Sequence, residues 1–435
     1  MVMDTQSRVA ALRRAKTIPV MEIAKAGSQK EILASSSAGG GGAGGALVHD
    51  HRTHAPGTGS GRASALTSPW TQSLGSTFGN DRDGVKSVEP APAAQMSSSN
   101  ELMQLLEFSP DGGELLTGSM SSELLACVAN IKGPRINVRT YPVKKYGVGP
   151  SIFAPSSGAH MVIHASNNAF DHSLRHLSLS DSRYVRYYRA HRDYVTSIAA
   201  VPRSHAFVSA AMDASVRFWD QRTSTCQGRI ALFRLGEVAQ IASDGVGVCL
   251  LVCTGSNSTL NPFHFESEFF DMRMYDRGPF LRRATNVPGL SRKAATRVES
   301  IYMSDDASRL LVGLRELAQS SVDEKALRTA LPRTSLTVLD GLSLNILHHL
   351  RASSSEEMPS EPAHTLVAQS SHISPDGVVA SCGTLGGQVC FWDVNSGRLL
   401  RTMEAHKSLV TSTRFHPSMN LFASVSSELH VWRVA

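Results

Sequence analysis

The chain has 435 residues, of which 41% are hydrophobic, and a formal net charge of +6. This composition suits one large domain with an additional polar segment, and the modest charge permits acidic or phosphorylated partners without requiring nucleic acid. We expect no membrane segment, no zinc site and no secretory leader, because no apolar run approaches roughly 20 residues, the six Cys form no CxxC pair, and the first 16 residues lack an apolar core.

Residues 1–28 contain one stretch of alternating apolar and polar residues, KTIPVMEIAK, from Lys16 to Lys25. Alternation predicts a β-strand, and Pro19 restricts it to a sheet edge because proline has no N–H to donate. Residues 29–99 hold SSSAGGGGAGG within a run of Ser, Thr, Gly, Ala and Pro. This composition predicts a low-complexity, disordered insertion.

From residue 100 onward, short apolar stretches of strand length alternate with turns, and no long helical period occurs. Residues 100–435 therefore predict an all-β domain. The stretches form seven groups, and the third to sixth contain Trp-Asp or a substitute for it, at Trp219-Asp220, Phe270-Asp271, Leu339-Asp340 and Trp392-Asp393. This repetition is typical of WD repeats and predicts a seven-bladed β-propeller.

The third group is the most complete, with His191, Ser209, Asp213 and Trp219 in the order and spacing of one WD repeat. A buried Trp N–H needs an acceptor, a Ser hydroxyl both accepts and donates, and a carboxylate fixes one imidazole tautomer. We therefore predict a hydrogen-bonded network that braces the blade. The same residue types occur in Ser/His/Asp catalytic sets, but no nucleophile elbow accompanies them, so we predict no catalytic residue, no cofactor and no metal.

The seventh group ends three residues after Trp432 and has three predicted strands instead of four. An unpaired sheet edge is an aggregation hazard. We therefore predict that residues 9–24 pair with the last blade and close the ring. The alternative is that residues 1–99 are all disordered and the last blade stays short.

Four stretches are more specific than the Trp-Asp dipeptides: KKYGV at 144–148, LRHLSLSDSRYVRYYRAH at 174–191, VRFWDQRTSTCQG at 216–228 and FFDMRMYDRGPF at 269–280. In these stretches the chain resembles the nuclear WD-repeat adaptor subunit shared by COMPASS-type histone methyltransferase complexes and by complexes of protein phosphatase 1 or of cleavage and polyadenylation factors. The segment 29–99, the insertion at 316–333 and the basic loop 281–297 depart from the family pattern. Which of these complexes the chain joins stays open.

The resemblance implies a non-catalytic nuclear scaffold, monomeric within a hetero-complex. It implies that the chain helps to dock a methyltransferase or phosphatase subunit on transcribing RNA polymerase II, partly through the phosphorylated C-terminal repeats of the polymerase. By their place after His191 and His406, Arg192, Tyr194 and Lys407 are predicted to lie in partner-binding loops, since Arg pairs with phosphate and Tyr offers a rigid contact surface. Ordinary solvated loop charges are the other explanation.

A second candidate set is Arg186 and Arg189, which alternate with tyrosines in RYVRYYRAH. Basic residues interleaved with aromatic ones can stack on and neutralise nucleic acid, whereas an outer strand with one wet face explains the same pattern. The alternative function is thus a propeller that binds RNA or DNA directly, through this strand and the loop 281–297. A propeller enzyme would need a polar cluster in the central channel, and the sequence holds no motif for one.

Overall fold

The computed structural model describes residues 103–119, 124–129, 131, 137–155, 160–232, 239–256, 263–290, 295–317, 333–352 and 364–433. They all belong to one compact unit. The predicted closing strand (residues 9–24), the predicted insertion (29–99) and most of the 316–333 loop lie outside the described residues.

The described residues form antiparallel sheets that follow one another in chain order. The first three sheets are β1 (Met103–Phe108), β2 (Glu114–Ser119), β3 (Leu124–Ala129) and β4 (Asn137–Pro142); β5 (Ser151–Phe153), β6 (Met161–Ala165), β7 (Leu174–Ser178) and β8 (Arg183–Tyr188); and β9 (Val195–Ala200), β10 (Ala206–Ala211), β11 (Ser215–Asp220) and β12 (Cys226–Ala231).

The next three sheets are β13 (Ala239–Ser243), β14 (Cys249–Gly255), β15 (Phe265–Asp271) and β16 (Leu281–Thr285); β17 (Thr296–Met303), β18 (Arg309–Glu316), β19 (Thr334–Asp340) and β20 (Ile346–Leu350); and β21 (His372–Ile373), β22 (Val379–Gly383), β23 (Gln388–Asp393) and β24 (Leu399–Glu404). The last sheet has three strands, β25 (Ser412–Phe415), β26 (Leu421–Val425) and β27 (Leu429–Arg433). Short 3-10 turns lie at Tyr275–Arg277 and Ala368–Ser370.

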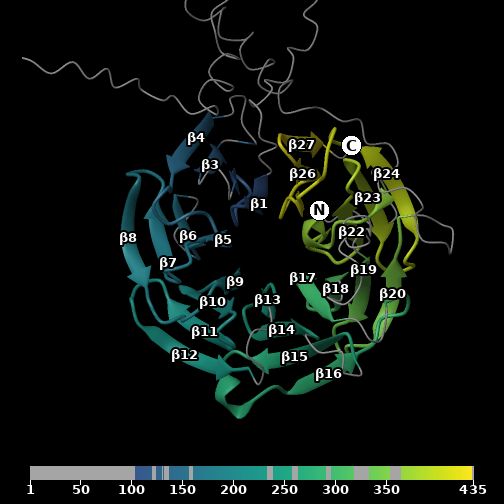
Figure 1. The fold of residues 1–435 in the computed structure, drawn as a ribbon, viewed down its shortest axis with the longest axis horizontal. Coiled ribbons are helices and arrows are strands. Elements are labelled where there is room, and N and C mark those ends of the chain that lie inside the picture. The colour runs from purple at the N-terminus through teal and green to yellow at the C-terminus, as the bar shows by residue number, and fades with distance from the viewer. Residues whose placement is uncertain are drawn as a thin grey trace, which may run out of the picture. The chain divides into compact units, whose positions relative to one another are not determined.

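The sheets are arranged around a ring, with the first strand of each sheet toward the centre and the last strand outside (Figure 1). The predicted all-β propeller is therefore found, with six complete four-stranded blades. The predicted count of seven complete blades is not reached in the described part of the chain, because β27 has no fourth strand beside it there. The predicted basic loop 281–297 is wrong at both ends, where residues 281–285 form the edge strand β16 and residues 296–297 begin β17.

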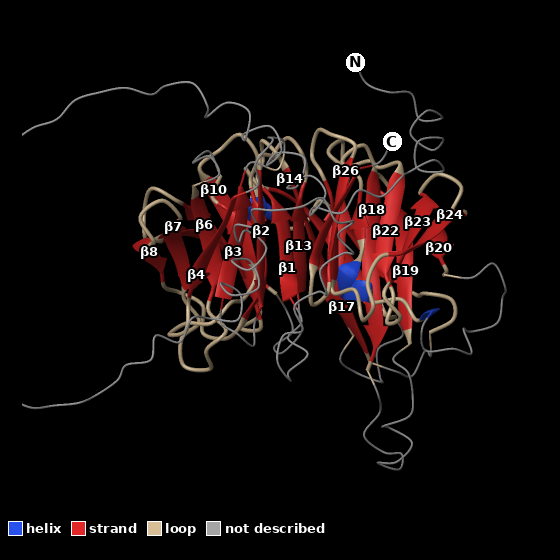
Figure 2. Cartoon of the chain, turned by 90° about the horizontal axis from the view of Figure 1, so that it is seen from above, coloured by secondary structure: helices blue, strands red, loops and turns tan. Residues whose placement is uncertain are grey.

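Loops gather at the two ends of the strands, as Figure 2 shows. Because neighbouring strands run antiparallel, the loops from the second to the third strand of a blade lie at the same end as the loops from the fourth strand to the next blade. We call this end the linking face; it includes residues 143–150, 166–173, 189–194, 212–214, 405–411 and 426–428. In each four-stranded blade, the loop between the first and second strands and the loop between the third and fourth strands lie at the other end, which we call the opposite face.

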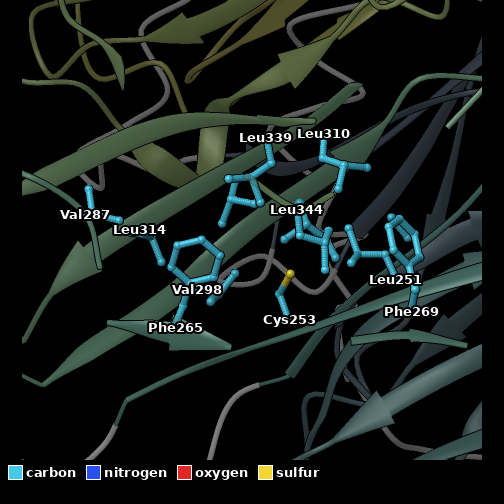
Figure 3. Close-up of a cluster of buried hydrophobic side chains, with 13 residues drawn as sticks. Leu251, Cys253, Phe265, Phe269, Val287, Val298, Leu310, Leu314, Leu339 and Leu344 are labelled. Carbon is cyan, nitrogen blue, oxygen red and sulfur yellow. The ribbon is translucent and has the colours of Figure 1, made fainter. Parts of the chain in front are cut away.

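The core lies between neighbouring blades rather than inside any one of them. One cluster joins Leu251, Phe265 and Phe269 of the fourth blade to Leu310 and Leu339 of the fifth (Figure 3). Each blade is covered on both sides, so its second strand is buried without alternation, as in AFVSAA of β10 and VASCG of β22. A single blade cannot bury these faces by itself, so the blades stabilise one another.

The first and last blades meet directly, and β1 lies beside β26 in Figure 1. The Met103 N–H donates to the Ser426 carbonyl oxygen at 3.0 Å, and the Arg414 guanidinium lies 3.3 Å from the Glu107 carboxylate. His416 Nε2 donates to the Gly112 carbonyl oxygen at 2.9 Å. These contacts fix the inner strands where the ring closes.

Candidate partner-binding face

The third blade contains the predicted network, and all four side chains come together. Trp219 Nε1–H donates to Ser209 Oγ at 2.8 Å, Ser209 Oγ lies 2.7 Å from His191 Nε2, and His191 Nδ1 lies 3.1 Å from Asp213 Oδ2. Ser209 lies mid-strand in β10 and Trp219 lies near the end of β11, whereas His191 and Asp213 come from two loops of the linking face. The network therefore attaches loops 189–194 and 212–214 to the rigid blade.

Burial and hydrogen bonding set the protonation states in this network. Burial lowers the pKa of His191, which keeps the imidazole neutral. Burial acts to raise the pKa of Asp213, but hydrogen bonds from His191 and Ser215 outweigh it and hold that pKa well below its usual range. Ser209 is fully buried and its hydroxyl is used by two partners, so no substrate can reach it as a nucleophile.

The last blade contains a similar network that the sequence reasoning missed. Ser424 Oγ accepts from Trp432 Nε1–H at 2.9 Å and lies 2.8 Å from His406 Nε2. The His430 ring stacks on the His406 ring at 4.4 Å, and the turn SSE offers no aspartate at the place of Asp213. The signal that would have revealed it is the His-to-Ser spacing of 18 residues, the same as from His191 to Ser209.

The three predicted partner-binding residues lie on the linking face, each just after a networked histidine. Arg192 is exposed, and its backbone N–H donates to Asp213 Oδ2 at 3.0 Å. The half-buried Tyr194 ring meets His172 edge-on at 5.2 Å. Lys407 is exposed and lies between the sixth and last blades, so the structure places it in another sector of the same face.

The predicted Arg/Tyr strand is β8, the outer strand of the second blade, and the structure uses much of it internally. The Arg186 guanidinium donates to the Gln221 carbonyl oxygen of the third blade, and the buried Tyr188 hydroxyl donates to the same oxygen at 3.1 Å. Arg189 is exposed, 5.7 Å from the Tyr187 ring centre. Arg186 and Tyr188 thus join two blades, which leaves no continuous row of free rings and cations along this strand.

Two of the specific sequence stretches meet in a buried cation–π cluster. Arg175 is fully buried, with its guanidinium carbon 3.5 Å from the Tyr146 ring centre and 5.8 Å from that of Tyr187. The same guanidinium forms an ion pair with Asp171. Aromatic faces and one carboxylate therefore replace the water that a buried guanidinium loses. KKYGV and LRHLSLSDSRYVRYYRAH belong together because one supplies Tyr146 and the other supplies Arg175 and Tyr187.

The other two specific stretches meet between the third and fourth blades. The Tyr275 ring stacks on Phe218 at 4.4 Å, and a Cβ added to Gly228 would lie 2.0 Å from the Tyr275 hydroxyl. Residue 228 therefore has to be glycine while Tyr275 occupies that space. The end of VRFWDQRTSTCQG and the tyrosine of FFDMRMYDRGPF are two sides of one packing contact.

The described residues hold no group of three or more His, Cys, Asp or Glu side chains in metal-binding geometry. No helix in the described segments is long and apolar enough to cross a membrane. All six cysteines are free thiols, and four of them are buried.

Comparison with known proteins supports the WD-repeat assignment. The family model described as WD domain, G-beta repeat matches residues 182–220 and 397–432, which contain the networked tryptophans of the third and last blades. WD repeat-containing protein 82 of Drosophila melanogaster is 26% identical over 328 residues, covering 75% of this chain and 89% of that protein.

COMPASS component SWD2 of Saccharomyces cerevisiae is 25% identical over 328 residues, covering 73% of this chain and 87% of that protein. Set1 complex component swd2 of Schizosaccharomyces pombe is 28% identical over 202 residues, covering 46% of this chain and 51% of that protein. These relatives confirm the resemblance predicted from the sequence: the chain is an all-β propeller that matches the WD repeat in two segments and is similar to a COMPASS component and to a Set1 complex component.

Proposed function

We propose that the chain is a non-catalytic scaffold in the nucleus, where its linking face holds a subunit of a COMPASS-type histone methyltransferase complex. The observation that carries the proposal is that buried networks anchor two separate loops of this face, at His191 and His406, and that each loop presents an exposed cation beside its anchor. Rigid loops lose little conformational entropy when they bind. The names of the relatives support a complex of this class.

Association with protein phosphatase 1 and with transcription termination or mRNA 3′-end processing is the second part of the proposal, and it rests on the family resemblance. The exposed cations Arg192 and Lys407 suit the phosphorylated repeats of RNA polymerase II, because guanidinium and ammonium groups donate to phosphate. Direct binding of nucleic acid along β8 is less well supported, since Arg186 and Tyr188 are used inside the propeller.

Purification of the tagged chain from nuclear extract tests this function. We expect the catalytic subunit of a COMPASS-type methyltransferase to co-purify, and we expect charge reversal of Arg192 and Lys407 to glutamate to reduce its recovery severalfold. The matched control is Arg277→Glu, an exposed arginine on the opposite face. Recovery of the chain alone, or equal loss with the control variant, would contradict the proposal. Recovery of protein phosphatase 1 without a methyltransferase would assign the chain to the termination complex.

We further propose the domain division 1–28, 29–99 and 100–435, with residues 9–24 as the fourth strand beside β27. The three-stranded last sheet and the alternation of TIPVMEI support this pairing. Hydrogen exchange on the full chain tests it. Amides of residues 9–24 are expected to exchange about as slowly as those of β27, and exchange at the rate of an unstructured peptide would show that the blade stays short.

A further inference from the structure

Phe170 has the most exposed large apolar side chain in the described part of the molecule, at 95%. It lies on the linking face, in loop 166–173 between β6 and β7. The loop is well fixed: the Phe170 N–H donates to Asn168 Oδ1 at 3.0 Å, the Asp171 N–H donates to the Asn168 carbonyl oxygen at 3.2 Å, and the Ser173 N–H donates to Asp171 Oδ1 at 2.9 Å. An aromatic ring is thus held in water at a defined place.

Loop 166–173 is also joined to the loops on both sides of it. The Asn167 N–H and the Ser166 hydroxyl both donate to the Tyr146 carbonyl oxygen, at 2.9 and 2.8 Å. On the other side, His172 packs edge-on against Tyr194. Three consecutive loops of the linking face therefore form one connected surface around Phe170.

This surface carries an excess of positive charge. Within the loops 143–150, 166–173 and 189–194 there are four lysines and arginines and two aspartates. One aspartate, Asp171, forms an ion pair with the buried Arg175. Lys144, Lys145 and Arg192 are exposed, and none forms an ion pair with a carboxylate in the described residues. A partner that covers Phe170 would lie beside these cations, so it is expected to carry negative charge.

We infer that the Phe170 surface, made of Lys144, Lys145, Phe170, Arg192 and Tyr194, binds an acidic protein segment in which one apolar side chain packs on the Phe170 ring. A pre-ordered aromatic side chain surrounded by charges has the character of an interface hot spot. The inference names the class of partner that the linking face binds. It rests on the proposed scaffold function, because the acidic segment is expected to belong to another subunit of the same complex.

A protein segment fits this surface better than single-stranded nucleic acid does. A nucleic-acid strand needs several aromatic platforms for successive bases. The neighbouring rings of Tyr146, Tyr184 and Tyr187 pack against one another, and the Tyr146 face is covered by Arg175. Phe170 is then the one fully exposed aromatic ring described on this surface, which suits a single apolar anchor.

The test is fluorescence anisotropy with the purified full chain and short labelled synthetic peptides. The first peptide is acidic with one central leucine, and the second has serine in place of the leucine. We expect the leucine peptide to bind about tenfold more tightly, and Phe170→Ala to remove that advantage. Lys144→Glu with Lys145→Glu should weaken both peptides and flatten the salt dependence of binding.

Matched variants separate these effects from damage to the fold. Leu342→Ala removes another exposed apolar side chain, 87% exposed on the opposite face, and should leave the affinity unchanged. Arg277→Glu is the control for charge. Phe170→Ala should melt at the wild-type temperature, because the ring it removes has almost no contact with the protein.

The inference is overturned if Phe170→Ala binds the leucine peptide as wild type does, or if leucine brings no advantage. It is also overturned if a single-stranded RNA binds more tightly than the leucine peptide and independently of Phe170. Co-purification from nuclear extract tests the scaffold function separately. Loss of peptide binding with intact co-purification removes only this inference, whereas peptide binding without co-purification removes only the proposed complex.

Discussion

Acidification from pH 7 to pH 5 is expected to destabilise the propeller by several kcal/mol. Burial lowers the pKa of His164 and of His176 to about 4 each, with further lowering by the charges of Arg175 and Arg186. In the unfolded chain both imidazoles titrate near 6.5, so between these values the unfolded state binds more protons. The stability that the two neutral histidines contribute is fully present above about pH 6.5 and is lost as the pH falls toward 4. At pH 5 the loss amounts to about 2 kcal/mol per histidine.

Other groups add to this dependence or oppose it. Burial lowers the pKa of His406 to about 3, which acts in the same direction. Burial raises the pKa of Glu107 despite the nearby Arg414, so protonation of that carboxyl favours the folded state as the pH falls. The contribution of the histidines therefore has to be isolated with variants.

Urea unfolding at pH 7, 6 and 5 provides the measurement. His164→Asn and His176→Asn keep an N–H near the position of Nδ1 but cannot be protonated, so each should reduce the loss of stability between pH 7 and pH 5 by about 2 kcal/mol. A wild-type free energy of unfolding that is constant over this range would contradict the expectation.

Replacement of Ser209 by alanine should cost about 2–4 kcal/mol, because it leaves the buried Trp219 N–H and the buried His191 imidazole without their shared partner. The loss should be smaller in a Trp219→Phe background, in which no indole N–H is left to satisfy. A double-mutant cycle measured by urea unfolding gives this coupling, and strictly additive costs would show that the hydroxyl does not join the two rings.

Two further serine variants provide a parallel case and a control for the Ser209→Ala result. Ser424→Ala removes the corresponding hydroxyl of the last blade and should cost a comparable amount, since Trp432 and His406 depend on it in the same way. Ser224→Ala lies in the exposed turn between β11 and β12 and should change the free energy of unfolding by less than about 0.5 kcal/mol. A cost at Ser224 equal to that at Ser209 would point to a general effect of serine replacement.

The residue pattern was informative wherever a contact repeats at a fixed spacing along the chain. It predicted the strands of the blades, the all-β propeller and the spacing of His191, Ser209, Asp213 and Trp219, since a WD repeat brings these positions together by local strand pairing. The network of the last blade escaped prediction because its turn lacks the aspartate that marks the third blade. That the last blade has three strands of its own was visible in the sequence and holds in the described residues, whereas its pairing with residues 9–24 stays a prediction.

Only the tertiary structure decided how side chains from different blades meet. The sequence by itself determined the repeat, the resemblance to an adaptor subunit and the stretches that carry it. It did not show that Arg175 lies against Tyr146, that Tyr275 fills the space beside Gly228, or that Arg186 and Tyr188 bind the next blade instead of solvent. Nor did it distinguish Phe170 from the buried phenylalanines. Alternation along a strand states which residues share a side, but what covers that side depends on the neighbouring blade, which is distant in the chain.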